Sequence, residues 1–60
     1  METNEMWRLP QVMKVTGLSK PSVYRFVKKG NFPKQYRLGE RAVAWRSDEI
    51  KKWIETRVAA

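Results

Sequence analysis

One tight turn, Thr16-Gly17-Leu18-Ser19, constrains this chain most, because a helix-ending residue and a helix-starting residue stand two positions apart in it. Glycine readily adopts the left-handed conformation that closes a helix, and serine is a preferred N-cap for the next helix. Apolar Leu9, Val12 and Met13 precede the turn at helical spacing. The sequence therefore predicts a short helix over residues 10–16 and a second helix directly after the turn.

The second helix is predicted over residues 20–29. Val23, Phe26 and Val27 repeat at the i, i+3, i+4 spacing of a buried stripe, and Gly30 ends the pattern. The polar and basic side chains that lie away from this stripe are Lys20, Ser22, Arg25, Lys28 and Lys29. One face of the helix is thus predicted to be buried and the other to carry positive charge.

A β-hairpin is predicted after the second helix, where the helical spacing of apolar residues ends. Segments 34–38 and 41–45 flank Gly39-Glu40, and glycine at the first central position suits a two-residue type II′ turn. That turn places Tyr36 opposite Val43. The residues predicted to share one face of the hairpin are Tyr36, Leu38, Val43 and Trp45.

A third helix is predicted over residues 48–58. Ser47 offers an N-cap, acidic residues occupy the first turn, and Ile50, Trp53 and Ile54 form an apolar stripe. The order helix, turn, helix, hairpin, helix predicts an α+β, mainly helical fold. We expect a small winged helix-turn-helix, in which the two-stranded antiparallel hairpin is the wing.

A chain of 60 residues without Cys or His permits one domain, residues 1–60, of which residues 1–6 are expected to be flexible. Disulfides, zinc fingers and catalysis by an imidazole base are excluded, so we expect no cofactor, no metal site and no enzyme activity. The acidic N-terminus lacks the apolar stretch of a signal peptide, and the apolar run at residues 42–45 is far too short to span a membrane. The expected location is the cytoplasm, with no membrane partner.

Positive charge is concentrated in the middle of the chain. The sequence holds 13 Lys and Arg against 6 Asp and Glu, a formal net charge of +7. Residues 17–46 contain eight of these basic residues and only Glu40 as an acid, so they carry the whole excess. A localised excess is typical of a polyanion-binding face, whereas an evenly solvated basic surface is the structural alternative.

Two short helices joined by a Gly-Leu-Ser turn, the second of them basic, are typical of a helix-turn-helix that binds double-stranded DNA. The second helix fits the major groove, where its side chains meet base edges while flanking cations meet phosphates. The predicted base-reading residues are Lys20, Ser22 and Arg25. The predicted contacts to the DNA backbone are Ser19, Tyr24, Lys28, Lys29, Lys34, Arg37 and Arg41.

Structural roles compete with binding roles at several positions. The Tyr24 side chain suits a phosphate contact and the edge of the core equally well. Ordinary surface positions on the third helix are expected for Lys51, Lys52 and Arg57. Lys52 is expected to pair with Asp48 or Glu49. The three tryptophans are expected in the core rather than stacked on bases: Trp7, Trp45 and Trp53.

A series of short motifs covers residues 8–57. In chain order they are Thr16-Gly17-Leu18-Ser19, Tyr24-Arg25, Gly30-Asn31-Phe32-Pro33, the run Leu38-Gly39-Glu40-Arg41-Ala42-Val43-Ala44-Trp45, and Trp53. Together they resemble AlpA-type prophage regulatory proteins, which are similar to phage excisionases and to MerR-type winged helix-turn-helix proteins. The resemblance implies a small DNA-binding activator of prophage integrase genes or a recombination directionality factor. Pro21 departs from the family pattern, so no target DNA sequence is carried over.

The sequence therefore predicts a sequence-specific transcriptional regulator of prophage type that binds double-stranded DNA and associates with the nucleoid when bound. One alternative is an excisionase-type factor that bends DNA. The other is a basic module that binds a protein such as RNA polymerase or an integrase. Because the chain has no coiled-coil seam, we expect a monomer in solution that can bind cooperatively on repeated sites.

Overall fold

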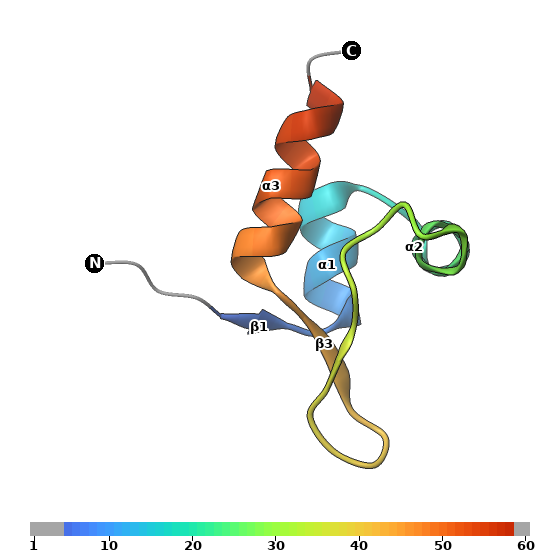
Figure 1. The fold of residues 1–60 in the computed structure, drawn as a ribbon, viewed down its shortest axis with the longest axis vertical. Helices are drawn as coiled ribbons and strands as arrows, with labels where there is room; N and C mark the ends of the chain where they lie inside the picture. The colour runs from blue at the N-terminus through green and yellow to red at the C-terminus, as the bar shows by residue number, and fades with distance from the viewer. Residues whose placement is uncertain (1–4, 59–60) are drawn as a thin grey trace.

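Residues 5–58, the part of the chain that a computed structural model describes, form three helices and a three-stranded antiparallel sheet (Figure 1). The elements in chain order are β1 (Met6–Trp7), α1 (Leu9–Thr16), α2 (Lys20–Lys29), β2 (Tyr36–Arg37), β3 (Val43–Arg46) and α3 (Ser47–Val58). The strand order in the sheet is β1-β3-β2. This arrangement is consistent with a small winged helix-turn-helix and confirms the predicted fold class; we call residues 36–46 the wing. Within the described residues, no helix is long and apolar enough to cross a membrane.

The helix-turn-helix forms where its local signals place it. Gly17 has a φ of 75° and its N–H donates to the Met13 carbonyl oxygen at 2.8 Å, which closes α1. The hydroxyl oxygen of Ser19 accepts from the Ser22 N–H at 3.4 Å and caps α2, as predicted. Gly30, with a φ of 79°, closes α2 at the predicted position. A side chain at either glycine would strain the left-handed backbone by about 1 kcal/mol or more.

The connection in the wing differs from the predicted type II′ turn. The Leu38 N–H donates to the Ala42 carbonyl oxygen at 2.7 Å, so residues 39–41 form a three-residue loop. Gly39 does not have the positive φ that a type II′ turn requires at its first central position. The observed register pairs Tyr36 with Ala44, one position away from the predicted pairing with Val43.

This shift changes which side chains share a face of the hairpin, because residues directly opposite one another lie on the same side. Tyr36 shares a face with Ala44, so the predicted common face of Tyr36, Leu38, Val43 and Trp45 is wrong. Leu38 is 52% exposed. The alternation in β3 could not fix the register, because Ala44 and Trp45, which point to opposite faces, are both fully buried.

The N-terminal segment contributes a strand that sequence periodicity did not predict. β1 pairs with β3, placing Trp7 opposite Trp45. The Glu5 N–H donates to the Ser47 hydroxyl oxygen at 2.9 Å, and the Ser47 N–H donates to the Glu5 carbonyl oxygen at 2.7 Å. Of the residues 1–6 that were expected to be flexible, Glu5 and Met6 pair with the body of the domain, and residues 1–4 lie outside the described part. Ser47 is the first residue of α3, and its hydroxyl binds this N-terminal segment.

The core lies between the helices and the sheet. Its buried side chains are Val12, Val23, Phe32, Trp45 and Ile50. Trp7 and Trp53 are partly buried against them, which confirms the core assignment of the tryptophans. The Phe32 ring lies edge-on to Trp53 at a centroid distance of 4.8 Å and to Trp45 at 6.2 Å. Phe32, in the loop after α2, thus joins the sheet to α3.

Candidate nucleic-acid interface

Most of the central basic side chains remain exposed. Seven of the eight in residues 17–46 are exposed: Lys20, Arg25, Lys28, Lys29, Lys34, Arg37 and Arg41. The eighth, Arg46, donates from Nε and Nη2 to the two carboxylate oxygens of Asp48 at 3.0 and 3.2 Å. These hydrogen bonds raise the pKa of the Arg46 guanidinium and lower the pKa of the Asp48 carboxyl. Arg46 is thus held by a neighbouring acid, and the other seven remain available to an anionic ligand.

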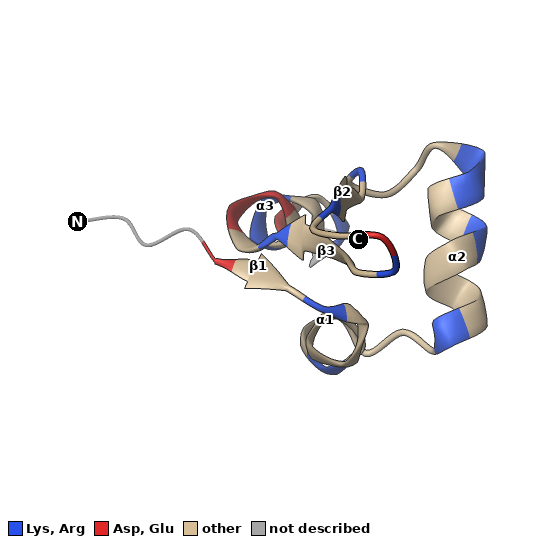
Figure 2. Cartoon of the chain, turned by 90° about the horizontal axis from the view of Figure 1, so that it is seen from below, with Lys and Arg blue, Asp and Glu red and all other residues tan. Residues whose placement is uncertain are grey.

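Helix α2 occupies one edge of the molecule. Figures 1 and 2 show it beside the body of the domain, with Lys and Arg distributed along its length. Val23 is fully buried and Phe26 and Val27 are half-buried, so the predicted apolar stripe faces inward. The segment after Ser19 is therefore not covered by the wing, and its basic side is open.

The buried stripe also defines how the remaining side chains of α2 are distributed. At about 100° per residue, the direction opposite the stripe is occupied by Pro21, Arg25 and Lys28, which we call the outward face. Tyr24 and Lys20 lie on the flank toward the wing loop, and Ser22 and Lys29 lie on the other flank. Of the three predicted base-reading residues, Arg25 therefore lies centrally, whereas Lys20 and Ser22 lie on opposite flanks.

The serine hydroxyls at the start of α2 bind one another. The Ser19 hydroxyl donates to Ser22 Oγ at 3.0 Å. The Ser22 hydroxyl hydrogen is consequently left to donate elsewhere, because its oxygen accepts in this pair. Both residues thus hold the helix N-terminus together, whatever further contacts they make.

The basic residues in the wing and just before it occupy different environments. Lys34 precedes β2, and its ammonium lies 5.3 Å from the centre of the Tyr36 ring. The Tyr36 hydroxyl donates to Glu49 Oε2 of α3 at 3.0 Å, which joins the wing to the body of the domain. Arg37 lies in β2, and Arg41 lies in the loop next to Glu40. The wing therefore presents cations at both its base and its tip.

A hollow of about 440 Å³ lies where the start of α1, the middle of α2 and the wing meet. The residues that line it are Arg8, Leu9, Pro10, Tyr24, Arg41 and Val43, and we call it the arginine hollow. Two predicted backbone-contact residues, Tyr24 and Arg41, are brought together here. Arg8 was missed by the sequence analysis, although its place directly before the Leu9-Pro10 helix start was a signal that it lies at a helix end.

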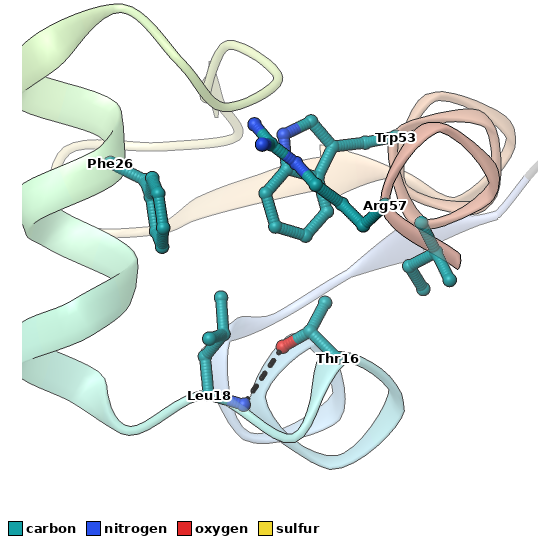
Figure 3. A pocket seen from close by; sticks show the side chains of 6 residues that line it. Thr16, Leu18, Phe26, Trp53 and Arg57 are labelled. Carbon is teal, nitrogen blue, oxygen red and sulfur yellow. Dashed lines mark hydrogen bonds between the residues drawn. The ribbon is translucent and has the colours of Figure 1, made fainter. Parts of the chain in front are cut away.

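A second concavity, the aromatic groove, lies between α2 and α3 (Figure 3). Its volume is about 360 Å³, and its lining is Thr16, Leu18, Phe26, Trp53, Ile54 and Arg57. The Arg57 guanidinium lies 4.6 Å from the centre of the Trp53 ring and 5.7 Å from that of Phe26. It also donates to the Asn31 carbonyl oxygen at 3.4 Å. Arg57, expected as an ordinary surface residue, thus packs on the aromatic side chains.

The predicted ion pairs of Lys52 do not form. Asp48 pairs with Arg46, and Glu49 accepts the Tyr36 hydroxyl, so both carboxylates are held by residues of the sheet. Among residues 5–58, no group of three acidic side chains is placed to hold a metal ion.

Comparison with known proteins gives a consistent result along nearly the whole chain. A family model described as "Prophage CP4-57 regulatory protein (AlpA)" matches residues 5–58. The chain is also 42% identical over 52 residues to a protein of Enterobacteria phage P4 named "Uncharacterized protein ORF88", covering 87% of this chain. The chain spans only 59% of that relative's own length. The extent of the family match, together with the helix-turn-helix and wing, shows that this chain belongs to the AlpA family of prophage regulatory proteins.

Proposed function

We propose that this chain is a sequence-specific transcriptional regulator of a prophage that binds double-stranded DNA, with α2 in the major groove and the wing on the adjacent backbone. The observation that carries the proposal is the outward face of α2, where Arg25 and Lys28 are exposed while Val23 anchors the opposite side. A helix about 10–12 Å across fits a major groove about 12 Å wide.

Roles for individual residues follow from their positions on α2. Arg25 is the main base-reading residue, because its guanidinium can donate to O6 and N7 of guanine together. Lys20 and Ser22 make flanking base contacts near the start of the helix. Contacts to phosphates come from residues of the helix and the wing: Ser19, Tyr24, Lys28, Lys29, Lys34, Arg37 and Arg41.

Phosphate contacts should dominate the salt dependence of binding. If five or six of the eight basic residues in residues 17–46 neutralise phosphates, the logarithm of the association constant should fall with the logarithm of salt concentration at a slope of about −5. A slope shallower than about −2 would contradict the proposed contact surface.

The decisive experiment is selection of bound duplexes from a random pool by the purified protein, followed by affinity measurements on the enriched and scrambled sequences. An enriched motif with a clear preference over the scrambled duplex supports the proposal. Strong bending of the selected site, seen by gel-shift bend analysis, would instead favour an excision factor. Failure to bind any duplex at moderate salt would exclude both and favour a protein partner.

A further inference from the structure

The arginine hollow brings together polar side chains from three separate parts of the chain. Arg8 directly precedes α1, Tyr24 belongs to α2 and Arg41 belongs to the loop of the wing. Leu9, Pro10 and Val43 complete its lining. The hollow therefore combines two guanidinium groups and one hydroxyl with an apolar surface.

Neither arginine is neutralised by a neighbouring carboxylate in the described part of the chain. Across residues 5–58, the ion pair between Arg46 and Asp48 is the only contact between opposite charges. Glu40, although adjacent to Arg41 in the loop, is not part of the lining. Two like charges around one hollow repel each other, and an anion between them would replace that repulsion with attraction.

The chemistry of the lining suits a phosphate diester. Guanidinium groups bind phosphate oxygens through paired hydrogen bonds, and a tyrosine hydroxyl can donate a further one. The apolar lining suits the sugar next to the phosphate. The hollow also lies between α2 and the wing, the two elements that the proposed function places on the duplex.

We propose that the arginine hollow holds one phosphate of the DNA backbone, bound jointly by Arg8, Tyr24 and Arg41, and that this phosphate fixes the position of α2 relative to the wing. The inference rests on the proposed function and assigns a binding role to Arg8. Because Arg8 and Arg41 belong to different elements, a shared phosphate links the start of α1 to the wing. Arg8 is thus a positioning residue for the base contacts of α2.

The test uses Arg8→Gln, Arg41→Gln and the double variant on the duplex selected by the wild-type protein, with Lys52→Gln on α3 as the matched control for lost charge. Each single variant should weaken binding about tenfold and make the salt slope shallower by about one. The double variant should lose less than the product of the two single losses, because both arginines bind the same phosphate. Lys52→Gln should bind nearly as wild type.

A second measurement locates the phosphate. Duplexes that carry a single neutral methylphosphonate are scanned along each strand, and one position should weaken wild-type binding about as much as the double variant does. At that position, the Arg8→Gln/Arg41→Gln double variant should show little additional loss. Thermal unfolding of each variant separates lost binding from lost folding.

The outcomes distinguish this inference from the function on which it rests. Wild-type affinity and salt slope in Arg8→Gln, or multiplicative losses in the double variant without a shared methylphosphonate position, would overturn the shared phosphate while leaving duplex binding intact. A wild-type protein that binds no duplex would overturn both proposals.

Discussion

The cations on the two sides of α2 lie in different surroundings. On the outward face and around the arginine hollow, Arg25, Lys28 and Arg41 are exposed and have no acidic partner in residues 5–58. On the side of the aromatic groove, Arg57 lies on Trp53 and Phe26 instead. Positive charge alone therefore does not mark a binding surface, because an exposed cation can be open to a ligand or can pack on aromatic rings.

The largest expected effect is on stability, from a substitution in the aromatic groove. Trp53→Ala removes a ring that packs on Phe26 and Phe32 and whose indole N–H donates to the Asn31 carbonyl oxygen at 2.7 Å. The free energy of unfolding should fall by about 3 kcal/mol, a large part of the total for so small a domain. Urea unfolding measures it, and an unchanged midpoint would show that the groove does not stabilise the fold.

Arg25→Ala tests the outward face. The affinity for the selected duplex should fall by about 1–3 kcal/mol and the preference over scrambled DNA should shrink, because a base contact is lost. Lys29→Ala, on a flank of the same helix, is the matched control and should weaken binding to all sequences alike. Equal losses on selected and scrambled duplexes for Arg25→Ala would remove Arg25 from base reading.

Arg57→Ala tests whether the aromatic groove contributes to stability and not to DNA binding. Loss of the cation–π contacts should lower the free energy of unfolding by about 0.5–1 kcal/mol. Binding to the selected duplex should change little, because Arg57 lies in the groove between α2 and α3. A loss of affinity as large as that of Arg25→Ala would show that the groove side also contacts DNA.

The smallest expected effect concerns the ion pair of Arg46 and Asp48. Hydrogen bonding from Arg46 lowers the pKa of the Asp48 carboxyl below its ordinary value of 3.8, so the ionised form stabilises the fold above that pH. This contribution should be lost as the pH falls through the lowered pKa. Thermal unfolding between neutral pH and about pH 3 should show a slightly shallower decline for Asp48→Asn than for the wild type. A steeper decline would contradict the sign of the shift.

The helix-turn-helix could be predicted closely, because its limits depend on residues within one turn of the chain. Gly17, Ser19 and Gly30 each act through their own backbone conformation or a hydrogen bond to a near neighbour. The helix ends in the folded chain are the ones that these local signals predict. The buried stripe of α2, which predicts which side faces outward, is equally local.

The register of the wing could not be predicted in the same way. Both faces of β3 are buried, so alternation of apolar residues is compatible with either pairing of Tyr36. The Tyr36 hydroxyl bond to Glu49 joins the wing to α3 only in the folded chain. Turn chemistry at Gly39 favoured a two-residue loop, and the three-residue loop forms instead.

The sequence by itself determined the two helix-closing glycines, the cap at Ser19 and the block of positive charge, because each is a property of neighbouring residues. Only the tertiary structure decided that Arg8, Tyr24 and Arg41 line one hollow and that Arg57 lies on Trp53. Both arrangements bring together residues from different parts of the chain, and their geometry depends on how the helices pack against the sheet. No local pattern encodes that packing, since the same basic residue is compatible with an open surface or an aromatic contact.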